Sequence, residues 1–175
     1  MLWQPLYLAR IFDSIPCFRY SGFDVVDSVV QKNIQTFLVD ARGPPGMQSR
    51  SSFATADLTQ GLPGGNYDLI LSRDALQHLD YASAARVLLA FCASQSTWLL
   101  VGSYPSETGS NREIEIGRYY RIDLAKEPFS LDPIETFSED FDGKFLYLYH
   151  LPTLCATDDV RARLSHLASK TSRRL

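Results

Sequence analysis

Two aspartates follow apolar segments of this chain at positions where a carboxylate could bind a ligand. Asp24 follows the segment Ser21-Gly22-Phe23, and Asp57 closes the segment formed by residues 52–57. A carboxylate has two acceptor oxygens, so it suits a ligand that presents two neighbouring hydroxyl groups. Each aspartate also has a simpler interpretation, because acids often solvate the end of a strand or stabilise a turn.

A third apolar segment, residues 67–72, is followed by two charged residues and a histidine. Arg73 and Asp74 come next, and His78 stands four residues further on. Histidine can accept a proton near neutral pH, so His78 is a candidate general base, with Arg73 and Asp74 as candidate catalytic neighbours. Alternatively, His78 is a packed structural residue, and Arg73 and Asp74 are simple salt-bridge partners.

Aromatic and basic residues gather again in the long polar segment 103–127. The sequence Arg118-Tyr119-Tyr120-Arg121 combines two guanidinium groups with two phenol rings. Such a set could bind an anionic or aromatic substrate through bidentate hydrogen bonds and ring stacking. A lid that packs its tyrosines on a sheet edge fits the same residues equally well.

Composition restricts the class of protein. The chain has 175 residues, 45% of them hydrophobic, and a net charge of −3, which suits one globular core and gives no support for a nucleic-acid surface. Cys17, Cys92 and Cys155 lie far apart without metal-ligand spacing, so no metal site is expected and the cysteines are predicted to be reduced and mostly buried. With no secretory signal and no membrane-spanning segment, a cytoplasmic protein is expected.

The elements that would position these residues alternate along the chain. Strands are predicted at residues 18–23, 52–57, 67–72 and 97–102, and a short helix at residues 6–12. Between the strands, apolar spacing predicts a helix over residues 29–37, capped by Asp27 or Ser28, and a helix over 81–92, capped by Asp80. Residues 40–51 are expected to form a loop. The alternation indicates an α/β fold with a parallel sheet.

The end of the chain departs from this alternation. Residues 133–139 and 144–149 flank Phe141-Asp142-Gly143, which predicts an antiparallel hairpin. We therefore expect one domain over residues 1–155 and a polar, basic tail over 156–175. That tail could contain a short helix with Val160, Leu164 and Leu167 on one side.

From Ser21 to about Leu151 the sequence resembles the class I S-adenosylmethionine-dependent methyltransferases, which have a Rossmann-like, mostly parallel sheet. In that family an acid after the second strand binds the cofactor ribose, as Asp24 would here, and an acid after the third strand meets the adenine, as Asp57 would. Residues 67–79 resemble the fourth strand and its following turn, beside the methyl donor and acceptor. The resemblance implies S-adenosylmethionine as cofactor and a small-molecule substrate.

A narrower resemblance covers residues 111–124, followed by Pro128-Phe129. It is similar to the loop of an uncharacterised methyltransferase subgroup with a pattern of the style Asn-x-Asp-Ile-x-x-Gly-x-x-Arg-Pro-x-Asn-Leu. The chain departs from that pattern at Glu113, where Asp is usual, and at Ile122, where Pro is expected.

A larger departure concerns the family's first strand and its acid-x-Gly-x-Gly loop. Residues 1–21 contain no glycine, so this motif has no counterpart before Asp24. The first strand normally lies between the second and the fourth, and its loss would leave two unpaired strand edges. Three explanations stay open: a start recorded too late, a truncated relative that has lost catalysis, or a misleading resemblance. Trp3 fits the first of these, because an aromatic residue often follows the glycine loop.

The expected function is therefore methyl transfer from S-adenosylmethionine to an unidentified, small-molecule acceptor. The alternative is a catalytically inactive interaction module on the same fold, with the segment after Val101 as its contact surface. A nicotinamide-dependent oxidoreductase shares the ribose-binding acid, but the Asp142-Gly143 hairpin counts against it.

Overall fold

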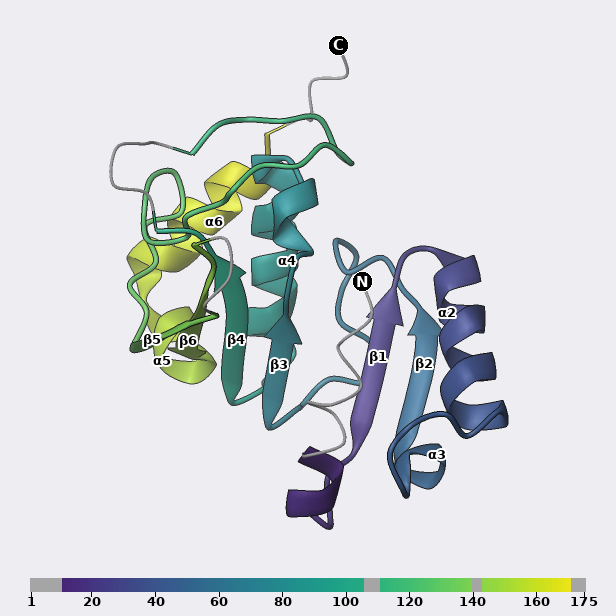
Figure 1. The fold of residues 1–175 in the computed structure, drawn as a ribbon. Helices are drawn as coiled ribbons and strands as arrows, with labels where there is room; N and C mark the ends of the chain where they lie inside the picture. Colours follow the sequence, from purple (N-terminus) through teal and green to yellow (C-terminus); the bar gives the residue numbers. More distant parts are fainter. Residues whose placement is uncertain (1–10, 106–110, 140–142, 171–175) are drawn as a thin grey trace. The chain divides into compact units, whose positions relative to one another are not determined.

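The computed structural model describes residues 11–105, 111–139 and 143–170. The chain divides into two compact units, Met1–Asp57 and Leu58–Leu175, and each is an α/β unit with its own sheet and core (Figure 1). The predicted helix at residues 6–12 lies mainly outside the described residues, which show helix over residues 11–14. Two further features of the sequence also lie outside the described residues: Trp3 and the basic pair Arg173-Arg174 of the predicted tail.

The first unit contains a two-stranded parallel sheet covered on one face by a helix. Strand β1 (Tyr20–Asp24) pairs with β2 (Ser51–Thr55), and α2 (Asp27–Asn33) continues as the π-helix η1 (Ile34–Val39). The cap prediction for α2 is wrong: Val26 occupies the N-cap position without a side-chain bond. The Asp27 carboxylate instead accepts a hydrogen bond of 2.8 Å from the Thr55 hydroxyl, which ties the helix to the sheet.

One arginine organises the core of this unit. The predicted loop at residues 40–51 ends in a helical turn, α3 (Met47–Arg50), and Arg50 returns its guanidinium to the chain before β1. It donates to the carbonyls of Pro16 and Gly46 at 2.8 and 3.2 Å and lies 4.8 Å from the centre of the Phe12 ring. Phe12, Phe37 and Met47 are buried beneath it. The guanidinium therefore satisfies loop carbonyls while its charge lies over an aromatic face.

The second unit contains a four-stranded mixed sheet in the order β3-β4-β6-β5. Strand β3 (Leu69–Ser72) is parallel to β4 (Trp98–Ser103), whereas β6 (Phe145–His150) is antiparallel to both β4 and β5 (Glu135–Ser138). Parallel pairing and the terminal antiparallel hairpin are both confirmed. The turn of that hairpin lies partly outside the described residues, because residues 140–142 are not among them.

Helix α4 (Tyr81–Ala93) forms where the sequence predicts it. The Asp80 carboxylate caps it by accepting from the Ser83 N–H at 2.7 Å. Its apolar side, including Ala84, Leu88 and Phe91, is fully buried against the sheet. A cap and a continuous apolar stripe are the two strongest local signals for a helix, and both act here.

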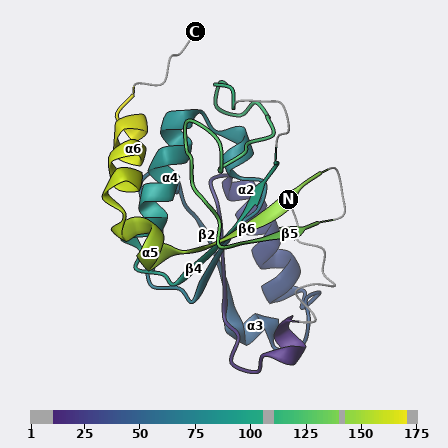
Figure 2. The same cartoon turned by 90° about the vertical axis from the view of Figure 1, so that its left-hand side faces the viewer.

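The chain after β6 forms two further helices, α5 (Leu151–Ala156) and α6 (Asp158–Ala168). Figure 2 shows α6 beside α4 on the same face of the sheet. Val160, Leu164 and Leu167 lie on one side of α6, as the sequence predicts, and all three are buried in the main core. The segment from residue 158 to 168 therefore contributes to the fold of this unit.

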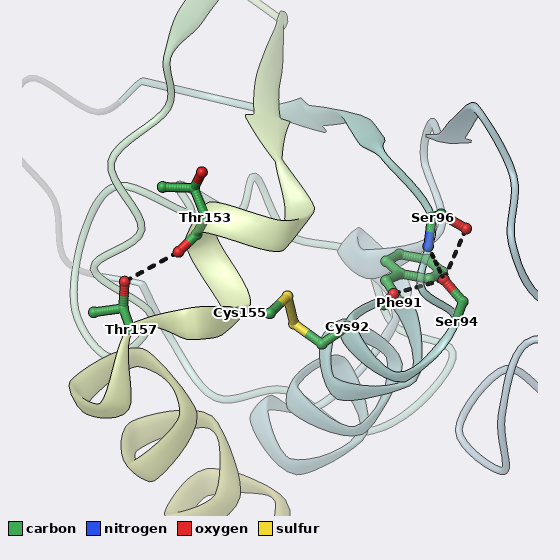
Figure 3. The surroundings of a disulfide bond; sticks show 7 residues. All are labelled: Phe91, Cys92, Ser94, Ser96, Thr153, Cys155 and Thr157. Atoms are coloured by element: carbon green, nitrogen blue, oxygen red, sulfur yellow. Dashed lines mark hydrogen bonds between the residues drawn. A yellow bond between two sulfur atoms is a disulfide. The ribbon is translucent and has the colours of Figure 1, made fainter.

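The prediction that the cysteines are reduced and mostly buried is wrong. Cys92 in α4 and Cys155 in α5 form a disulfide with 5.6 Å between their Cα atoms (Figure 3). Cys17 is free and exposed. Strand β6 runs antiparallel to β4 and so delivers α5 to the end of α4, which brings together two residues 63 positions apart. Sequence spacing alone contains no sign of this pairing.

The same end of α4 holds a small network of serines, also visible in Figure 3. The Ser94 hydroxyl donates to the Phe91 carbonyl at 2.7 Å and lies 2.8 Å from the Ser96 hydroxyl, which accepts from the Tyr67 N–H at 2.8 Å. These bonds end the helix and join the starts of β3 and β4.

Removal of the disulfide should destabilise the fold. In the chain-entropy description, a cross-link between residues 63 apart contributes up to about 4 kcal/mol to the free energy of unfolding. We expect Cys92→Ser/Cys155→Ser to lower the urea midpoint strongly, and Cys17→Ser to leave it unchanged. A double variant as stable as the original protein would contradict this expectation.

Candidate functional site

Asp24 and Asp57 lie at the carboxyl edge of the two-stranded sheet in the first unit. Asp24 is the last residue of β1 and pairs in register with Thr55, and its backbone carbonyl accepts from the Ala56 N–H at 2.9 Å. Asp57 therefore follows β2 at the same edge, two residues beyond that pairing. One carboxylate oxygen of Asp24 accepts from the Val26 N–H at 2.8 Å. Its second oxygen has no hydrogen-bond partner among the residues that the structure describes.

Arg73, Asp74 and His78 lie in the second unit, in the segment that follows β3. Asp74 adopts a left-handed backbone conformation with φ of 58°. Its side chain is 7% exposed and its Oδ1 forms an ion pair with Lys144 Nζ, whose side chain is 10% exposed. Its Oδ2 is buried without a hydrogen-bond partner, 3.6 Å from the Arg73 guanidinium. Arg73 itself donates to Glu139 at 2.9 Å.

This ion-pair group continues into aromatic residues. Lys144 Nζ lies 5.6 Å from the centre of the Tyr104 ring, and the exposed Arg121 lies 5.5 Å from the same ring. The Tyr119 hydroxyl donates to the Tyr104 hydroxyl at 2.7 Å, and the rings of Tyr119 and His78 are 5.4 Å apart. A continuous set of contacts thus joins the terminal hairpin to His78.

The loop over residues 111–127 is held by hydrogen bonds rather than by helix or strand. The Asn111 side chain accepts from the Asp123 N–H and donates to the Asp123 and Glu127 carbonyls, each at 2.8 Å. The Glu113 carboxylate accepts from the Tyr81 N–H, the first in α4, at 2.8 Å. Asn111 and Glu113, the residues that begin the subgroup-like pattern, therefore hold the loop in place.

The structure separates the four predicted substrate-binding residues. Tyr119 and Arg121 join the aromatic and charged group described above. Tyr120 is 3% exposed in the core against Tyr81, and burial raises the pKa of its phenol. Arg118 has a side chain that is 77% exposed beside Glu115, at 3.8 Å, while its backbone carbonyl contacts His78 Nδ1 at 3.1 Å.

Three members of this group escaped sequence reasoning: Tyr104, Glu139 and Lys144. Tyr104 directly follows β4, and Lys144 directly precedes β6, as the first residue of the segment 144–149 that the sequence predicts as a strand. A lysine at the start of an otherwise apolar strand was the available signal. Its partner Asp74 is 70 residues away, so the pairing itself was not visible.

The described helices include none long and apolar enough to cross a bilayer. Within the described ranges, no three His, Cys, Asp or Glu side chains gather as a metal site would require.

Comparison with known proteins gives matches at the level of structure. No family profile and no curated protein matches the sequence. The fold is similar to that of the mitomycin 7-O-methyltransferase MmcR, with a TM-score of 0.63 and 13% identity over 81% of this chain and 44% of that one. It also matches PigF with SAH, with a TM-score of 0.58 and 14% identity over 79% and 45% of the two chains.

A third similar structure is an O-methyltransferase family 2 protein from Planctomyces limnophilus in complex with apigenin. The TM-score is 0.58, with 17% identity over 83% of this chain and 46% of that one. The chain has the fold of S-adenosylmethionine-dependent methyltransferases. It spans less than half the length of each of these three proteins.

Substitution of Lys144 should show how much the ion pair between Lys144 and Asp74 contributes to the free energy of unfolding of this fold. Lys144→Met leaves the buried Asp74 carboxylate with only the longer contact of 3.6 Å to Arg73, which costs up to roughly 3–5 kcal/mol of unfolding free energy. We expect the double variant Asp74→Asn/Lys144→Met to be more stable than Lys144→Met alone, because it removes the stranded charge. Urea unfolding of the original protein, Asp74→Asn, Lys144→Met and the double variant measures this coupling, and additive effects would argue against the pair.

Tyr119 provides a second test of the group. Partial burial and then its hydrogen bond to Tyr104 raise the pKa of Tyr119 to about 12. The bond stabilises the protonated phenol, so Tyr104→Phe should lower the pKa of Tyr119 towards 10. Carbon-13 NMR titration of labelled tyrosines would follow this change, with Tyr81, whose pKa is raised to about 12 by burial and by Glu113, as an internal control. An unchanged Tyr119 pKa would exclude the bond.

Proposed function

We propose that this chain transfers the methyl group of S-adenosylmethionine to a small-molecule acceptor. The observation that carries the proposal is the group after β3, in which Arg73, Asp74 and His78 meet Tyr104 and Tyr119 at the carboxyl ends of β3 and β4. In open α/β sheets, ligands bind beyond the carboxyl ends of the strands. The same group stands on a fold that MmcR and the Planctomyces limnophilus protein share.

Asp24 and Asp57 are the proposed cofactor-binding residues. The partly buried Asp24 keeps one carboxylate oxygen without a partner in the described part of the chain, so it can accept hydrogen bonds from ribose hydroxyls. Asp57, at the same sheet edge, is proposed to meet the adenine. PigF, whose structure contains SAH, supports the choice of cofactor.

Residues of the second unit are proposed to orient the acceptor. When bound, S-adenosylmethionine supplies a methyl group that is already activated on a sulfonium sulfur, so alignment provides most of the catalysis. An acceptor that must lose its proton would give it to His78 as its oxygen or nitrogen forms the new bond to the methyl carbon and the carbon–sulfur bond breaks, which leaves the electron pair on sulfur in the demethylated product. Tyr119 and Arg121 would contact the acceptor by stacking and hydrogen bonding, with Arg118 at the exposed rim.

We also propose that the family's first strand is missing from the described fold. Strand β1 pairs only with β2, and β3 only with β4, so within the described residues each has one open edge. Open edges carry N–H and C=O groups that need partners. A strand that pairs with one of these edges and brings a glycine-rich loop would supply such partners.

Titration calorimetry with SAH, the demethylated product, tests the proposal. Binding should weaken by about tenfold or more in Asp24→Asn, because a hydrogen bond to a charged group contributes about 1.5–3 kcal/mol. The substituted amide retains an acceptor for Val26, so the local turn survives. Asp68→Asn, at the start of β3, serves as the matched control and should bind like the original chain.

The same titration should be run on the chain as given and on a version extended upstream in its natural reading frame. Tighter binding by the extended version would support the missing strand. Failure of both to bind SAH at millimolar concentration would overturn the methyltransferase proposal.

A further inference from the structure

The His78 ring is held by a turn in the loop that packs beside it. Its Nδ1 lies 3.1 Å from the Arg118 carbonyl oxygen, and its own backbone carbonyl accepts from the Gly117 N–H at 2.8 Å. One residue earlier, the Gln77 carbonyl accepts from the Tyr120 N–H at 3.1 Å. Three hydrogen bonds thus join residues 77–78 to residues 117–120.

The chemistry of these partners fixes the proton on the ring. A carbonyl oxygen can only accept, so the contact with Arg118 requires Nδ1 to carry a hydrogen. In the neutral imidazole the lone pair is then on Nε2. Among the residues that the structure describes, Nε2 has no hydrogen-bond partner, and the Tyr119 ring packs at 5.4 Å from the imidazole.

We propose that Gly117 is a positioning residue, whose turn aims the Arg118 carbonyl at His78 and so presents Nε2 as the proton-accepting atom. The role in methyl transfer rests on the proposed function, whereas the tautomer of His78 does not. Gly117 has φ of 89°, a conformation that side chains with a Cβ rarely adopt, and a Cβ added there would have no atom within 4 Å. Substitution therefore acts on the backbone of the turn and causes no steric clash.

The charges near the ring do not offer another explanation for this arrangement. Arg118 directs its side chain away, 77% exposed beside Glu115. Asp74 and Lys144 form an ion pair with each other and reach His78 only through Tyr104 and Tyr119. Among the described residues, the ring makes its polar contact with the backbone carbonyl of Arg118.

Nitrogen-15 NMR of the imidazole rings measures the tautomer directly, at a pH where the ring is neutral. The chain has three histidines, so His78→Gln identifies the signal. We expect a single Nδ1–H tautomer in the original protein. Gly117→Val should give a mixture of both tautomers, because a β-branched residue resists a positive φ. Gly117→Ala gives a milder version of the same change if the valine variant does not fold.

Three controls separate positioning from general damage. Gly117→Asn should retain the tautomer, because Asn tolerates the left-handed region. Arg118→Ala should retain it as well, since the carbonyl survives. Gly61→Val strains another glycine of positive φ with open space around it and should leave His78 unchanged.

The proposal is overturned if the original protein shows both tautomers, or if Gly117→Val and Gly117→Ala keep the single one. It is also overturned if Arg118→Ala alone abolishes the preference. Cofactor binding is measured separately by calorimetry, so loss of SAH binding with a fixed tautomer would count against methyl transfer and leave the role of Gly117 in place.

Discussion

A buried carboxylate in the second unit depends on a cation from the other end of that unit. Asp74 lies two residues after β3 in a left-handed conformation, and Lys144, directly before β6, reaches it. A lone charge at this depth would be strongly unfavourable, so β6 must pair with β4 in the register that brings Lys144 to Asp74. Tyr104 packs against that cation, and Tyr119 and His78 follow in turn. The geometry of the candidate site is thus a consequence of where the hairpin lies.

The long loop contributes order without regular secondary structure. Hydrogen bonds replace the ladder of a strand or the turns of a helix. The loop backbone bonds to Gln77 and His78, the Ile122 carbonyl accepts from the Tyr104 N–H, and the Asn111 amide bonds to the loop backbone. Every such bond satisfies a group that would otherwise lose water on folding. This explains how residues 111–127, between β4 and β5, can position side chains although their pattern contains no periodic signal. The residues of the subgroup-like motif are largely structural in this sense, and only part of the Arg118–Arg121 run is available to a ligand.

Sequence reasoning succeeded where the signals were local and failed where they were not. The strand before Asp24, the capped helix after Asp80 and the hairpin each follow from spacing within about fifteen residues, and the structure contains all three. The cap prediction for α2 is wrong because the Asp27 carboxylate accepts a hydrogen bond from Thr55. Thr55 lies on β2, which follows the helix in the sequence. The disulfide and the Asp74–Lys144 pair join residues that only the topology brings together. Tyr119 and Tyr120 are adjacent, yet Tyr119 is 44% exposed and Tyr120 3% exposed, a difference that the residue types of this segment do not indicate.

The disulfide also defines a covalent ring. Cys92 and Cys155 enclose β4, the loop that carries Tyr104 and Gly117, and the hairpin with Lys144, whereas Arg73, Asp74 and His78 lie outside it. A protease that cuts the exposed turn at Gly117 would therefore leave two fragments joined through sulfur, and they would separate only after reduction. The loop with Gly117, which orients His78, thus lies inside the ring, whereas His78 itself lies outside it, and packing holds the two together. The ring is closed by a disulfide that a reductant can open.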